Sequence, residues 1–123
     1  SDCTVMEVDS NFLGPAALAK AYRFVGDPRD DSSQQRFKTL NEYGGVWDCT
    51  RCMKCVEVCP KGVAPMDRIM ALREQVMESG YQNTNGARHA TEFANSIKHG
   101  GWLDEKKLVI KSISSILLQE SLT

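Results

Sequence analysis

The chain has 123 residues, of which 41% are hydrophobic and 25% are charged, and its formal net charge at pH 7 is −1. Length and composition are typical of a soluble globular protein with a modest hydrophobic core. A near-neutral balance without a basic stripe argues against binding to nucleic acid, and the sequence has no apolar run of 18 or more residues that would span a membrane.

The N-terminal third predicts a lead-in followed by two helices. Residues 1–11 are polar and lack a helical period, so we expect them to be extended. Gly14-Pro15 opens a helix that Gly26 ends, because proline is favoured in the first turn and glycine after the last. We expect a second, short helix over about 33–42. The broad apolar face of the first helix should be well buried; it comprises Leu13, Ala17, Leu18, Ala21, Tyr22, Phe24 and Val25.

The next stretch carries the main chemical signal of the sequence. Trp47 precedes it, and we expect this indole to act as a hydrophobic lid. Four of the five cysteines follow within eleven residues, spaced C-x2-C-x2-C-x3-C-P: Cys49, Cys52, Cys55 and Cys59. This is the spacing of the bacterial-ferredoxin run, whose thiolates hold an iron–sulfur cluster. In two-cluster ferredoxins the cysteine before the proline ligates the other cluster, so Cys59 is expected to point away from its three neighbours.

The alternatives to an iron–sulfur site are weaker. Soft thiolates also suit zinc, but zinc sites usually separate two C-x-x-C pairs by a dozen or more residues, and no second pair is present. An odd number of cysteines argues against a framework of disulfides. Inert core cysteines do not explain the spacing. We therefore favour iron–sulfur and keep a structural zinc-binding interaction module as the alternative.

The remainder of the chain predicts three amphipathic helices over about 65–78, 86–99 and 105–118, with Arg68 and Arg73 on the solvent side of the first. No segment predicts a strand, so we expect an all-α fold. The side chains expected to face inward are Met66, Ile69, Met70, Val76 and Met77 in the first helix, Ala90, Phe93, Ala94 and Ile97 in the second, and Leu108, Val109, Ile113, Ile116 and Leu117 in the third. We divide the chain into a cluster-binding region, 1–80, and a helical C-terminal extension, 81–123.

Three blocks of the sequence carry a resemblance to a known family. They are Phe12-Leu-Gly-Pro-Ala-Ala-Leu-Ala-Lys-Ala-Tyr-Arg23, Asp27-Pro-Arg-Asp-Asp31 and Cys55-Val-Glu-Val-Cys-Pro-Lys-Gly62. With them the chain resembles the C-terminal half of the iron–sulfur subunit of succinate dehydrogenases and fumarate reductases. The resemblance implies an α-helical ferredoxin domain with two clusters. It also leads us to expect a chain truncated at its N-terminus, because the family's preceding 2Fe–2S domain has no counterpart here.

The resemblance also implies a set of cluster ligands. The last cysteine of the family's first run matches Cys3, which would join Cys49 and Cys55 at one cluster. The position of Cys52 is commonly not cysteine in the family, and that site holds a 3Fe–4S cluster. Because Cys52 adds a fourth thiolate, we expect a 4Fe–4S cluster on these four residues. Cys59 would serve a second iron–sulfur cluster, expected only in the full-length subunit because its other ligands are absent.

By the same resemblance the chain is expected to relay electrons and to carry no catalytic residue of its own. Its implied partners are a flavoprotein subunit and a membrane-associated quinone-reactive subunit, which would hold it at the membrane, on the cytoplasmic face in bacteria or alternatively the periplasmic face. The segment 87–105 is similar to the small subunit of heterodisulfide reductases, which implies a cysteine-rich partner instead. A radical enzyme lacks support, because its usual C-x3-C-x2-C spacing is missing. In an isolated fragment we expect an exposed cluster to be lost or replaced by zinc.

Overall fold

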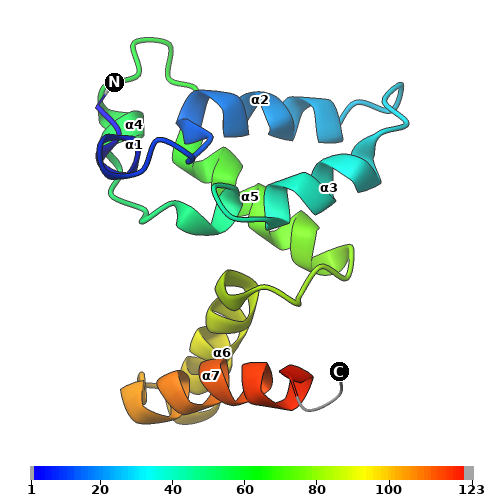
Figure 1. The fold of residues 1–123 in the computed structure, drawn as a ribbon. Helices are drawn as coiled ribbons and strands as arrows, with labels where there is room; N and C mark the ends of the chain where they lie inside the picture. The colour runs from blue at the N-terminus through cyan, green and yellow to red at the C-terminus, as the bar shows by residue number, and fades with distance from the viewer. Residues whose placement is uncertain (1, 121–123) are drawn as a thin grey trace. The chain divides into compact units, whose positions relative to one another are not determined.

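The computed structural model describes residues 2–120, with side chains placed for residues 2–113. Within that range the secondary structure is helical and contains no strand (Figure 1), which confirms the expected all-α class. Two compact units follow one another along the chain, Ser1–Gln82 and Asn83–Thr123. None of the described helices has both the length and the apolar composition needed to cross a membrane.

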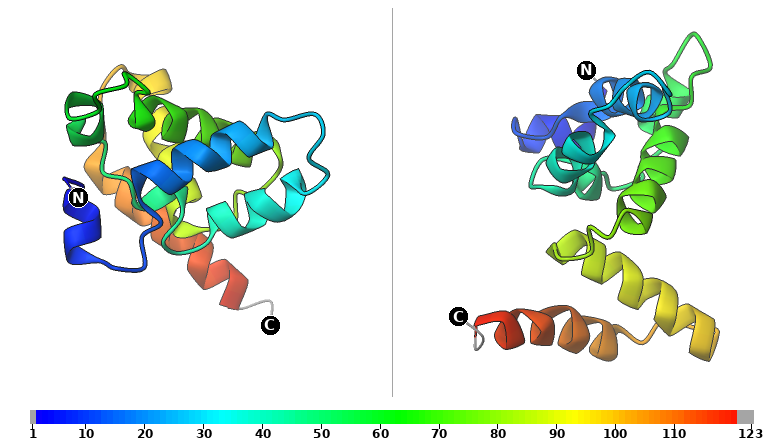
Figure 2. Two further views of the ribbon diagram at one scale, coloured as in Figure 1. Left: turned by 90° about the horizontal axis from the view of Figure 1, so that it is seen from above. Right: turned by 90° about the vertical axis from the view of Figure 1, so that its right-hand side faces the viewer.

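The first unit is organised around one central helix. Its elements are α1 (Thr4–Val8), α2 (Gly14–Val25), α3 (Ser33–Asn41), the 3-10 turn η1 (Val46–Asp48), α4 (Lys54–Glu57) and α5 (Pro65–Glu78). Both α2 and α3 pack against α5 (Figures 1 and 2), and η1 and α4 contact it as well. The elements on either side of the first cysteines of the run, η1 and α4, therefore both contact α5.

The core of this unit lies between α5 and the two helices that it contacts. Leu18 of α2 and Ile69, Leu72 and Val76 of α5 are fully buried. Leu72 was not among the residues expected to face inward, although it completes the stripe that Ile69 and Val76 define. On α2 the expected face is too broad, because Leu13, Ala17 and Phe24 are exposed. A helix that contacts its neighbours along one seam buries a narrow stripe.

The N-terminal lead-in is helical and not extended, so that expectation is wrong. α1 begins after Cys3, whose carbonyl accepts a hydrogen bond from the amide of Glu7 at 3.3 Å. A helix of five residues is not stable by itself, so tertiary contacts have to hold it. Val5 supplies one such contact, since it packs partly buried against the core.

The chain turns sharply before the cysteine run. Val46 is fully buried, and a side chain at Gly45 would collide with the carbonyl of Leu40, so only glycine fits this close approach. Trp47 packs half-buried against the core and does not line the pocket of the cysteines, so its role as a lid stays a prediction. Its indole nitrogen also donates a hydrogen bond to Oδ1 of the buried Asn41 at 2.9 Å. η1 therefore fixes the point at which the cysteine loop starts.

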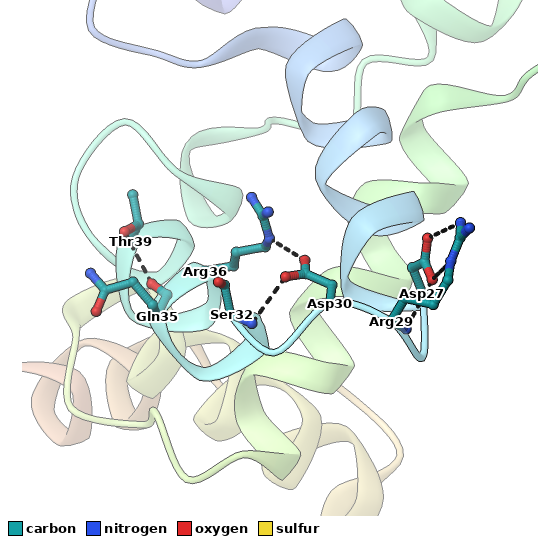
Figure 3. A network of polar contacts seen from close by, with 7 residues as sticks. All are labelled: Asp27, Arg29, Asp30, Ser32, Gln35, Arg36 and Thr39. Carbon is teal, nitrogen blue, oxygen red and sulfur yellow. Dashed lines mark hydrogen bonds and ion pairs between the residues drawn. The ribbon is translucent and has the colours of Figure 1, made fainter.

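The turn between α2 and α3 is held by carboxylates (Figure 3). Asp27 pairs with Arg29 at 2.8 Å, and Asp30 accepts hydrogen bonds from Ser32 N at 2.9 Å and from Arg36 Nε at 2.6 Å. Asp30 thus ties the turn to the first residues of α3. These contacts give the second resemblance block a structural role.

The second unit is a helical hairpin of α6 (Asn85–Gly100) and α7 (Glu105–Glu120). Thr84 caps α6 by accepting a hydrogen bond from Ala87 N, and Oδ1 of Asp104 accepts one from Lys107 N at 3.2 Å. Leu108 is buried as expected, whereas Phe93, Ala94, Ile97, Val109 and Ile113 are exposed, contrary to expectation. Ile116 and Leu117 lie outside the residues whose side chains are described.

Candidate metal centre

Four cysteines line one small pocket in the first unit: Cys3, Cys49, Cys52 and Cys55. The rest of its lining is largely apolar and comprises Val5, Phe12, Pro15, Thr50, Met53, Met66 and Ile69. Cys59 does not contribute to the pocket. All five cysteines lie in the described part of the chain, and none of them is in a disulfide. The residues proposed as ligands of one cluster thus face the same space, although their ligand role stays a prediction.

Three separate elements bring these thiols together. Cys3 caps the start of α1, Cys49 follows η1, and Cys55 lies in α4. Between them Arg51 and Met53 have φ angles of 59° and 67°, in the left-handed region on either side of Cys52. Such a conformation costs a non-glycine residue about 1–2 kcal/mol. Cys52 is exposed and contributes to the pocket from between these two residues.

The thiols of the pocket do not share one electrostatic environment. Hydrogen bonds from the amide of Lys54 and from the hydroxyl of Thr4 lower the pKa of Cys52 below its ordinary value. The oxygen of that hydroxyl lies 3.9 Å from the Cys52 sulfur. Burial instead raises the pKa of Cys55. The thiolate is the form that binds metal, and the surroundings favour that form at Cys52 and disfavour it at Cys55.

Cys59 has a setting of its own beyond α4. Backbone N–H groups of Val63 and Lys61 hydrogen-bond its sulfur and lower the pKa of Cys59. Successive N–H groups of a turn form a concave site for anions, and here such groups favour the thiolate form of Cys59. The structure therefore separates Cys59 from the other four cysteines. This agrees with the expectation that the cysteine before Pro60 points away from its neighbours.

One residue of the site was missed by the sequence reasoning, which put Arg73 on the solvent side of its helix. Its Nε donates to Val46 O at 2.8 Å, and its Nη2 donates to Trp47 O at 3.2 Å and to Cys49 O at 2.6 Å. Arg73 follows Ile69 by four positions and so shares the buried stripe of α5. That register is the signal that would have found it.

The donor set fits an iron–sulfur cluster in chemistry, because four thiols suit soft metal ions and the rest of the lining is largely apolar. The pocket itself is small, about 20 Å³, which is room for a single water molecule. Among the described residues, no three Cys, His, Asp or Glu side chains are arranged to hold one metal ion.

This fold and this cysteine set define an iron–sulfur protein of ferredoxin type, and comparison with known families agrees. The family of 4Fe–4S dicluster domains matches residues 1–63, just over half of the chain, and the chain belongs to that family. The expected resemblance is thereby confirmed, since the curated relatives are iron–sulfur subunits of fumarate reductases and succinate dehydrogenases.

Three relatives illustrate the extent of the similarity. The fumarate reductase iron–sulfur subunit of Escherichia coli O6:H1 is 43% identical over 63 residues, 51% of this chain and 26% of its own. The succinate dehydrogenase iron–sulfur subunit of Coxiella burnetii is 34% identical over 67 residues, 54% of this chain and 28% of its own. The 8-methylmenaquinol:fumarate reductase iron–sulfur subunit of Wolinella succinogenes is 28% identical over 113 residues, 90% of this chain and 35% of its own.

The chain therefore spans about a quarter to a third of the length of these relatives. No solved structure matches it significantly.

Proposed function

We propose that this chain is the electron-transfer part of an iron–sulfur subunit in a fumarate reductase or succinate dehydrogenase complex. The observation that carries the proposal is the convergence of Cys3, Cys49, Cys52 and Cys55 on one apolar pocket in a chain of the 4Fe–4S dicluster family. These four thiolates would hold a 4Fe–4S cluster, with Cys52 as the fourth ligand. When bound, such a cluster accepts and releases one electron at a time.

The protein's own groups prepare this site. Phe12, Met66 and Ile69 give the pocket an apolar lining, and the N–H of Lys54 and the hydroxyl of Thr4 stabilise negative charge on Cys52. Apolar surroundings and hydrogen bonds to sulfur are the means by which a protein sets a cluster's reduction potential. Cys59 stands ready for a second iron–sulfur cluster, whose other ligands would come from residues outside this chain.

The names of the relatives support a proposal for the partners. Subunits with these names work in complexes that convert fumarate and succinate, so we propose a flavoprotein partner on one side. The Wolinella relative, which aligns along 90% of this chain, is named for 8-methylmenaquinol as well. This supports a membrane-associated, quinone-reactive partner on the other side, either of the ordinary type or cysteine-rich. The complex would lie at the membrane, with this chain on the cytoplasmic face.

The proposal is tested by measuring iron, acid-labile sulfide and zinc in the anaerobically purified chain, with EPR spectra before and after reduction. We expect about four iron and four sulfide per chain and a signal in the reduced state. Cys52→Ser should lower the iron content or convert the signal to that of an oxidised three-iron cluster. Cys59→Ser is the matched control and should leave the iron content unchanged.

Two results would contradict the proposal. One zinc per chain without sulfide, even after anaerobic reconstitution, would identify the structural zinc module instead. A wild-type content of three iron, unchanged in Cys52→Ser, would keep the electron-transfer function and remove Cys52 from the ligand set.

A further inference from the structure

Arg73 binds the segment that presents Cys49. From α5 its guanidinium group donates to three carbonyl oxygens of η1 and the residue after it, those of Val46, Trp47 and Cys49. The planar group also lies over the indole ring of Trp47, 5.4 Å from its centroid. A guanidinium fork presents several donors in fixed directions, which a lysine ammonium does not. The backbone of Cys49 is therefore positioned by one side chain from a different element.

The charge of Arg73 has no carboxylate partner. Among the residues whose side chains the structure describes, no Asp or Glu lies within ion-pair distance of its guanidinium. The nearby Asp48 accepts a hydrogen bond from Gly44 N at 2.7 Å. Burial lowers the pKa of Arg73, but an arginine stays protonated in proteins. A half-buried cation usually requires a compensating anion.

The structure places this cation next to Cys49, whose carbonyl oxygen accepts a hydrogen bond from Arg73 Nη2 at 2.6 Å and whose side chain lines the cysteine pocket. A cluster held by four thiolates is an anion overall, and reduction adds one more negative charge to it. A fixed cation behind one ligand therefore stabilises the reduced form more than the oxidised form.

We propose that Arg73 is a positioning residue that anchors the Cys49 segment and, through its charge, raises the reduction potential of the cluster bound at this pocket. The inference rests on the proposed function, since it presupposes a bound cluster. It adds a residue outside the cysteine run to the determinants of the site. It also explains why an arginine occupies the buried stripe of α5 next to Leu72.

The test compares three variants of the full chain after anaerobic reconstitution. Arg73→Gln removes the charge but keeps an amide donor, Arg73→Lys keeps the charge but loses the fork, and Arg68→Gln removes a charge from an exposed position of the same helix. Each is titrated with reductant and followed by EPR, and thermal unfolding is recorded in parallel. The comparison of the two Arg73 variants separates the electrostatic role from a merely structural one, because both lose the fork and only Arg73→Lys keeps the charge.

We expect Arg73→Gln to lower the midpoint potential by about 59 mV, which corresponds to a tenfold fall in the reduced-to-oxidised ratio at fixed potential. The midpoint potential of Arg73→Lys should lie close to that of the wild type, because the charge is kept. The midpoint potential of Arg68→Gln should equal that of the wild type. If Arg73→Gln holds no cluster while Arg73→Lys does, the charge is again supported, because both variants lack the fork.

Equal potentials in the wild type and Arg73→Gln would overturn the inference. So would loss of the cluster from both Arg73 variants, which would leave Arg73 as a structural clamp only. Absence of a cluster from the wild type itself would refute the proposed function and is thereby distinguished from failure of this inference.

Discussion

At the scale of single residues, Asp30 shows how one carboxylate holds a turn. Hydrogen bonds from Arg36 and from Ser32 N depress the pKa of Asp30 below its ordinary value of 3.8 (Figure 3). A carboxyl whose pKa is lower in the folded state stabilises the fold above its unfolded pKa. That stabilisation is lost as the pH falls through the folded pKa, when the group takes up its proton.

Asp30→Asn should therefore be less stable than the wild type at neutral pH, and the difference should close in acid. The measurement is the melting temperature of both proteins from neutral pH to about pH 2.5. Asp31→Asn changes an exposed neighbour in the same way and serves as the control. A difference in melting temperature that does not vary with pH would show that the loss comes from packing and not from the charge.

Residue-level sequence reasoning succeeded where a residue's local context decides its role and failed where register decides. The cysteine spacing pointed to soft-metal chemistry without any structure, and the family match agrees. The predictions for Leu72 and Arg73 were wrong because the inward face of α5 was assigned from its methionines. Counting positions from Ile69 would have placed both on the buried stripe.

At the scale of elements, α5 is the helix against which the other elements of the first unit pack. Leu72 is fully buried at its centre, so Leu72→Ala should lower the free energy of unfolding by about 2–5 kcal/mol. Leu13→Ala removes the same atoms from a side chain that is 45% exposed and should cost about 0.5 kcal/mol. Urea unfolding followed by far-UV circular dichroism measures both. Similar losses in the two variants would mean that α5 is not the centre of the core.

The longer helices were predictable, and the short ones were not. The bounds expected for α5, 65–78, are those observed, because Pro65 starts the helix and its apolar period continues to Met77. α1 was expected to be extended because five residues give no period to recognise. α6 and α7 show a different limit of prediction. Their apolar stripes predicted the helices correctly but not the burial of the side chains, because the pattern does not indicate which part of the protein covers them.

At the scale of the whole molecule, the structure consists of two units, and the pocket belongs entirely to the first. A chain ending at Gln82 should therefore fold and hold as much iron and sulfide as the full chain. Residues 83–123 alone should hold none, because they contain no cysteine. The measurement is iron and sulfide content after parallel reconstitution. A large loss of iron from the shorter chain would make the second unit part of the site.

The convergence of Cys3 on the cysteine run was not predictable from spacing. Forty-six positions separate Cys3 from Cys49, and no local rule relates residues so far apart. Only the family resemblance implied that they meet. Folding brings them together through α1 at one end and η1 at the other, both of which depend on tertiary contacts.

The short helix α4 has a consequence for the path of an electron. Cys55 faces the pocket, whereas Cys59, four positions later, does not. The covalent connection between the two proposed redox sites therefore runs from Cys55 through the end of α4 at Glu57 to Cys59. Rates of electron tunnelling fall steeply with distance. A covalent connection this short sets an upper limit on the distance between the two proposed clusters. That limit is set by bonded geometry and holds even if packing elsewhere in the molecule loosens.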